Sequence, residues 1–191
     1  MTTIVQSSWL GAISGAYEVA ANWSPSQVPT YGASPATEYD VTLGPSGSGT
    51  AFTVTSSANE QVGFLTVNPS ATFNVAGGTF AVYSTVNFYS IVYNFGKVNI
   101  LSGATMKFGV PNSPPKSSSE IDNLGTVNIS GTLSLATHWF GLKGSGAVVL
   151  SNGHIVGGAA GTNNSLTNIT NTISGSGSLA LPKIARTSIR Q

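Results

Sequence analysis

The sequence predicts an all-β protein, a single-chain parallel β-solenoid with irregular coils. Charged residues make up only 7% of the chain and apolar residues 40%, while Gly, Ser, Thr and Asn fill most of the rest, a composition that disfavours helices. Short alternating apolar and polar runs recur along the chain with turn residues between them. Two of these strand, bend, strand segments repeat one another, which favours stacked coils over a sandwich.

The composition is typical of one folded domain. The length of 191 residues allows a sizeable core, and we expect one solenoid domain over 1–191, with an N-terminal cap over 1–38, coils over 39–181 and a tail over 182–191. The formal net charge of +1 provides no basic field for a phosphate backbone, so nucleic acid is not expected as a partner. The chain has no cysteine for disulfides, and no apolar run approaches the ~20 residues of a membrane span.

The expected strands are each four or five residues long, because turn residues interrupt every alternating run. They cover 39–43, 51–55, 63–67, 71–75, 79–82, 97–100, 105–108, 126–129, 132–135, 147–150 and 178–181. Strands this short suit coils whose corners are made by Gly, Ser and Asn.

The clearest internal repeat joins segment 94–108 to segment 123–135. Both read Asn, apolar, Gly, any residue, Val-Asn-Ile, then Ser-Gly and a second strand. In such a repeat each coil buries its inward side chains only by stacking on the next coil. We expect Asn94 and Asn123 to form a hydrogen-bonded ladder at a corner, with a metal or sugar role as the alternative.

The order of the segments resembles the autotransporter, haemagglutinin and adhesin-like β-helix surface proteins of Gram-negative bacteria. The resemblance lies in the opening, with Trp9, then Asn22–Ser24, Pro29 and the strand 40–43, and in the Leu-Thr-Asn strand and Ile-Ser-Gly turn of 165–177. It implies a right-handed parallel β-helix, placed outside the cell or on its surface, that acts in adhesion, biofilm matrix or surface-layer formation. Family members are usually far longer than this chain.

Signals for an enzyme are weak. The pairs Glu38 with Asp40 and Glu120 with Asp122 each sit two residues apart on a predicted strand face, as a polysaccharide lyase or hydrolase would require, but we favour a solvated strand face or a bend as their explanation. No nucleophile elbow, phosphate loop, dinucleotide fingerprint or metal-spaced histidine pair occurs in the sequence. We therefore expect no catalytic residues, no metal and no cofactor.

Two groups of residues are candidates for contact with partners. The first is a set of aromatic and neighbouring residues suited to a protein interface or a glycan, of which about half should fill the core: Tyr83, Phe88, Tyr89, Tyr93, His138 and Trp139. The second is a basic C-terminal group that is either a solvated tail or a tail for docking on a neighbouring subunit: Lys183, Arg186 and Arg190.

The leading functional expectation concerns the ends of the solenoid. Open coil faces template further pairing unless they are capped, and the segment from Trp9 to Trp23 is the natural N-terminal cap. The C-terminal residues show no obvious polar cap. We expect an extracellular structural protein whose partner is itself, assembling into a fibre by head-to-tail stacking or strand exchange. The alternatives are a carbohydrate-binding adhesin that contacts surface glycans, and a polysaccharide lyase or hydrolase.

Overall fold

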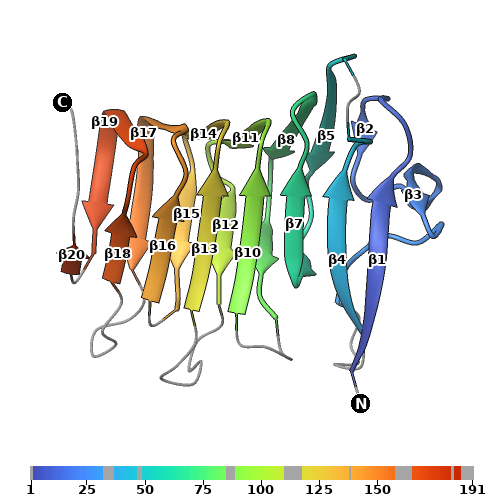
Figure 1. The fold of residues 1–191 in the computed structure, drawn as a ribbon, viewed down its shortest axis with the longest axis horizontal. Helices are drawn as coiled ribbons and strands as arrows, with labels where there is room; N and C mark the ends of the chain where they lie inside the picture. The colour runs from blue at the N-terminus through green and yellow to red at the C-terminus, as the bar shows by residue number, and fades with distance from the viewer. Residues whose placement is uncertain are drawn as a thin grey trace.

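The computed structural model describes residues 2–31, 37–46, 49–84, 89–109, 118–137, 139–157, 165–181 and 183–185. Over these residues the chain forms the expected β-solenoid, with its two termini at opposite ends of the stack (Figure 1). Each full turn contributes one strand to a nine-stranded sheet, sheet A, and two to an eleven-stranded sheet, sheet B. Sequence order therefore becomes position along the solenoid axis.

Sheet A contains eight parallel strands and one short antiparallel strand, β3, that pairs with β1 at the N-terminal end. Its strands in spatial order are β3 (Trp23–Ser24), β1 (Thr3–Trp9), β4 (Thr37–Leu43), β7 (Phe64–Val67), β10 (Tyr89–Asn94), β13 (Ser118–Asn123), β16 (Trp139–Lys143), β18 (Ser165–Asn168) and β20 (Lys183–Ala185).

Sheet B has two arms that meet at long strands near the C-terminal end. The first arm contains β2 (Gly15–Ala16), β5 (Phe52–Ser56), β8 (Ala71–Val75), β11 (Lys97–Ile100) and β14 (Thr126–Ile129). The second contains β6 (Glu60–Val62), β9 (Thr79–Val82), β12 (Thr105–Phe108) and β15 (Thr132–Leu135). Strands β17 (Ala147–Gly157) and β19 (Thr172–Ala180) run through both arms, and a short 3₁₀ helix, η1 (Ala20–Asn22), lies near the N-terminus.

The internal repeat of the sequence is confirmed as a stacking register. Strands β11 and β14 pair in parallel with Val98 opposite Val127 and Ile100 opposite Ile129. These four side chains are buried, at 1% exposure or less, because alternate residues of each strand point into the solenoid. Identical inward residues on adjacent coils therefore build one continuous apolar core.

The expected asparagine ladder is also confirmed, and it is buried. Asn94 Nδ2 donates to Asn123 Oδ1 at 2.8 Å, and Asn123 Nδ2 donates to Asn171 Oδ1 at 2.9 Å. Asn123 Nδ2 also donates to the Ala147 carbonyl, and Asn171 Nδ2 donates to the Lys143 carbonyl. These three residues, the inner Asn ladder, satisfy backbone carbonyls at the corner that follows sheet A.

Two boundaries of the predicted organisation differ in the structure. The coils begin within the proposed cap, because β1 pairs in parallel with β4 from Thr3 onward. They also extend into the proposed tail, because β20 pairs with β18 over Lys183–Ala185. Sequence patterning missed most sheet A strands, including β10, β13 and β16, where buried residues do not simply alternate with exposed ones.

Candidate functional surfaces

The outer face of sheet A is the first surface of interest. Connections that lead into this sheet are long, such as 83–88 before β10 and 109–117 before β13, whereas the corners that follow the same strands are 95–96 and 124–125. The connection 44–51 after β4 is also long, and Gly63 alone joins β6 to β7.

Aromatic and charged side chains gather on this outer face, in a group that we call the sheet A patch. It consists of residues from three consecutive strands, β10, β13 and β16: Tyr89, Tyr93, Glu120, Asp122, Trp139 and Lys143. The register aligns Tyr89 with Ser118 and Trp139 in one row across the strands. A second row contains Tyr93, Asp122 and Lys143.

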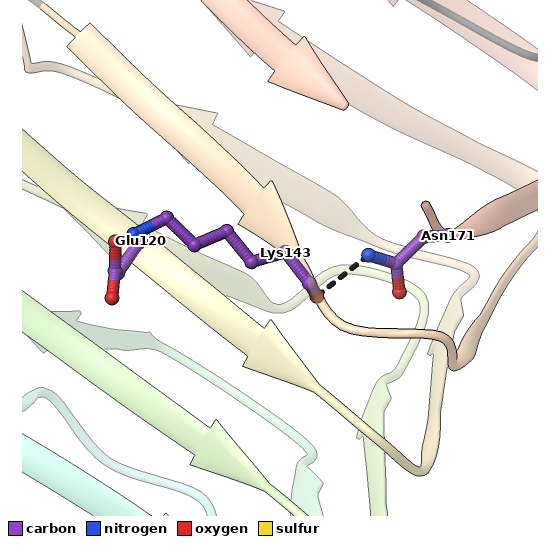
Figure 2. Close-up of polar contacts among 3 residues, drawn as sticks. All are labelled: Glu120, Lys143 and Asn171. Carbon is purple, nitrogen blue, oxygen red and sulfur yellow. Dashed lines mark hydrogen bonds and ion pairs between the residues drawn. The ribbon is translucent and has the colours of Figure 1, made fainter. Parts of the chain in front are cut away.

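An ion pair occupies the centre of the sheet A patch. Lys143 Nζ lies 2.5 Å from Glu120 Oε2, and Figure 2 shows the Lys143 side chain extending from β16 toward the Glu120 carboxylate on β13. The Glu120 side chain is nearly buried, at 8% exposure, whereas that of Lys143 is 40% exposed. Burial and a hydrogen bond with the Glu120 carboxylate raise the pKa of Tyr89 above its ordinary value, so its hydroxyl remains a donor.

Trp139 lies against the floor of the same patch. A Cβ placed on Gly141, two residues along β16, would lie 2.9 Å from the Trp139 ring, so the ring occupies the space that a side chain would fill. The same Cβ would lie 3.5 Å from Glu120 Cβ, which places the indole beside the buried carboxylate. Trp139 nevertheless remains 36% exposed.

The structure brings together part of the predicted aromatic group. Tyr89, Tyr93 and Trp139 lie on the sheet A patch, as a surface role requires. Tyr83 does not: it follows β9 and is only 8% exposed, in keeping with the expectation that about half of the group fills the core. Phe88 and His138 lie outside the described residues. Sequence reasoning missed the ion pair, because Glu120 and Lys143 become neighbours only through strand register.

The two carboxylate pairs have different surroundings. Asp40 Oδ2 accepts from Gln6 Nε2 at 2.7 Å and Glu38 Oε2 accepts from the Tyr31 hydroxyl at 2.7 Å. Burial raises the pKa of Asp40, and the sequence contains no Lys, Arg or His before Lys97. Glu120 and Asp122 instead lie beside Lys143. Within the described residues, no group of three or more His, Asp or Glu side chains is placed to hold a metal ion.

The N-terminal end of the solenoid is the second surface. Here β5 pairs with β2 at Val54 and Thr55, and side chains of the preceding segment cover the amides on either side of this pairing. Ser14 Oγ accepts from the Thr53 amide at 2.9 Å, and Glu18 Oε1 accepts from the Ser57 and Ala58 amides at 2.6 and 3.1 Å. These contacts satisfy amides that a further strand would otherwise pair with.

Aromatic rings fill the core beneath this cap. The Trp9 and Trp23 ring centroids are 5.0 Å apart and those of Tyr17 and Trp23 are 4.8 Å apart, both edge to face. The outside of the cap is apolar in places, because Leu10, Ile13 and Val19 are 47%, 68% and 45% exposed. The cap therefore covers the edge of β5 but leaves apolar side chains in solvent, and it pairs the outer edge of β1 only at Ser8 and Trp9.

A shallow pocket of about 260 Å³ lies beside the cap, lined in part by Thr30, Asn59 and Glu60. Glu60 is 7% exposed. Burial raises the pKa of the Glu60 carboxyl group. A hydrogen bond with Thr30 lowers this pKa and the negative charge of Glu18 raises it, and the net shift is upward.

The C-terminal end differs from the N-terminal end. Within the described residues, β19 pairs on one side only, with β17, and its segment Gly175–Ser178 is exposed. Lys183 begins β20, the last strand of sheet A, although its side chain is outside the described part. Arg186 and Arg190 lie outside the described residues.

Charge is separated along the axis. The first 96 residues contain four acidic residues and no basic one, whereas the remainder contains all seven Lys and Arg residues and only two acids, Glu120 and Asp122. Because sequence order becomes axial position in a solenoid, the first turns carry the four acidic residues, and the described basic residues all lie on later turns: Lys97, Lys107, Lys143 and Lys183. Overall composition hides this separation, but the positions of the charges in the sequence reveal it.

Within the described residues, no helix has the length and apolarity needed to cross a membrane. Comparison of the chain with protein-family models, with curated proteins and with solved structures gave no match.

Proposed function

We propose that this protein is an extracellular structural subunit that associates with copies of itself, the C-terminal end of one solenoid stacking on the N-terminal cap of the next. The observation that carries the proposal is the axial separation of charge, with no basic residue before Lys97 and seven after Gly96. Head-to-tail contact places opposite charges together, whereas contact between two like ends places like charges together.

Exposed apolar side chains at the cap support the same arrangement. Leu10, Ile13 and Val19 are each at least 45% exposed and lie near Glu18, so the cap offers apolar area close to an acidic residue. Burial of such side chains stabilises an interface by about 25 cal/mol per Å² of apolar surface. Charge steers the ends together and apolar burial then holds them.

The covered edge of β5 favours stacking over strand exchange in sheet B. Ser14 and Glu18 already accept the amide hydrogens of Thr53, Ser57 and Ala58. An incoming strand would first have to displace these contacts. A heterologous contact that does not close into a ring extends without limit, so repeated stacking produces a filament.

The test is analytical ultracentrifugation of the purified protein over a range of concentration. We expect the average mass to rise with concentration, and the association to weaken from about 0.01 M to about 1 M salt, as the Debye length falls from about 30 to about 3 Å. Monomers at high concentration and low salt would overturn the proposal.

A matched pair of substitutions locates the contact. Ile13→Ser removes a 68% exposed apolar side chain from the cap, and Leu124→Ser removes a 53% exposed one from a lateral corner between β13 and β14. We expect Ile13→Ser to weaken association and Leu124→Ser to leave it unchanged. Equal effects of the two substitutions would contradict an end-to-end interface.

A further inference from the structure

We propose that the sheet A patch binds a neutral polysaccharide, with Trp139 as the surface on which a sugar ring stacks. Tyr89, Ser118 and Trp139 form one row across β10, β13 and β16. Neighbouring strands are about 4.8 Å apart, so the two aromatic residues are separated by about 9.6 Å at their backbones. Ser118, the small residue between them, is partly exposed.

The aromatic residues suit the apolar faces of a sugar ring. Trp139 is 36% exposed and its ring is held against Gly141, where a Cβ would come within 2.9 Å of it. The indole is therefore supported from below while part of it faces solvent. A large ring already held in place loses little conformational entropy when a ligand stacks on it.

The polar groups of the patch suit sugar hydroxyls. The nearly buried Glu120 carboxylate is held by the Lys143 ammonium at 2.5 Å and by a hydrogen bond with Tyr89. Carboxylate and ammonium groups fixed on rigid strands present acceptors and donors in a defined geometry. This combination of aromatic surface and a few oriented polar groups is typical of ligand sites.

The charge balance selects the class of saccharide. Glu120 and Asp122 contribute two negative charges to the patch and Lys143 one positive charge. An acidic polysaccharide would meet this excess of negative charge, and Lys143 is already paired, so repulsion disfavours it. A neutral chain pays no such penalty. Because the patch lies on a side of the solenoid, it stays accessible when subunits stack through their ends.

The experiment is affinity electrophoresis and calorimetry with two probes, a soluble neutral β-linked glucan and polygalacturonate. We expect the wild-type protein to bind the glucan and to bind polygalacturonate more weakly. Trp139→Ala should weaken glucan binding by about tenfold or more, since a central aromatic anchor is removed, and Trp139→Phe should restore part of it. Phe95→Ala is the matched control, because Phe95 is a 39% exposed aromatic residue on the corner after β10, outside the patch.

Each outcome bears on the proposal. Absence of glucan binding, unchanged binding by Trp139→Ala, or stronger binding of polygalacturonate would each overturn it. Failure of the protein to form filaments would not overturn it, because filament contact involves the cap, whereas glucan binding involves the sheet A patch. Ile13→Ser changes the cap and leaves the patch intact. We expect Ile13→Ser to bind glucan with the affinity of the wild-type protein.

Discussion

Replacement of Asn123 by Ala should remove the centre of the inner Asn ladder. The Asn123 side chain is fully buried and takes part in three hydrogen bonds, from Asn94 Nδ2 at 2.8 Å, to Asn171 Oδ1 at 2.9 Å and to the Ala147 carbonyl at 3.1 Å. At about 1 kcal/mol for each bond, the free energy of unfolding should fall by about 3 kcal/mol. This is a large part of the 5–15 kcal/mol that is typical of folded domains.

The matched control is Asn128→Ala, five residues after Asn123 but on the outer surface. Asn128 Nδ2 donates to Asn99 Oδ1 at 2.7 Å in a partly exposed position, where water can replace the lost bond. The expected cost is about 0.5 kcal/mol. Urea unfolding followed by circular dichroism measures both variants. If Asn123→Ala proves no more destabilising than Asn128→Ala, the buried ladder does not stabilise the stack as argued.

Two further changes test the stack and the cap. Gly125→Ala should destabilise the fold in thermal unfolding, because its Cβ would meet the Gly96 carbonyl oxygen of the preceding coil, whereas Gly49→Ala, with nothing within 4 Å, should be nearly neutral; equal melting temperatures would contradict the close stacking. The raised pKa of Glu60 predicts added stability at low pH: this contribution is fully present below the ordinary value of 4.5 and is lost as pH rises through the raised pKa. Glu60→Gln should therefore raise the melting temperature at pH 7. In this variant the melting temperature should also increase less between pH 7 and pH 4.5 than it does in the wild-type protein. A pH profile identical to that of the wild-type protein would refute burial of the Glu60 charge.

The sequence predicted sheet B well and sheet A poorly. Strands β11, β12, β14 and β15 begin and end where the alternating pattern placed them, because their inward residues are apolar and their outward residues polar. In β13 the consecutive residues Ser119, Glu120 and Ile121 are all buried, so the strand has no alternating signal. Side chains of neighbouring strands bury the outer face of β13, and the periodicity within one strand carries no information about its neighbours.

The sheet A patch had the same limit. Tyr89 and Trp139 were individual candidates in the sequence, but their alignment in one row depends on the lengths of two successive solenoid turns. The first turn, from Tyr89 to Ser118, spans 29 residues, and the second, from Ser118 to Trp139, spans 21. Unequal turns hide the register from any fixed sequence period. Prediction of the axial charge separation requires only the solenoid fold and the order of the charges in the sequence, because stacking of the coils converts sequence position into axial position.

Electron microscopy of the purified protein at high concentration and low salt tests the central claim of head-to-tail stacking most directly. We expect unbranched filaments one solenoid wide, in which the nine strands of sheet A, at about 4.8 Å each, give an axial repeat of about 43 Å per subunit. Dispersed single particles, or assemblies joined through the sides of the solenoid, would contradict it.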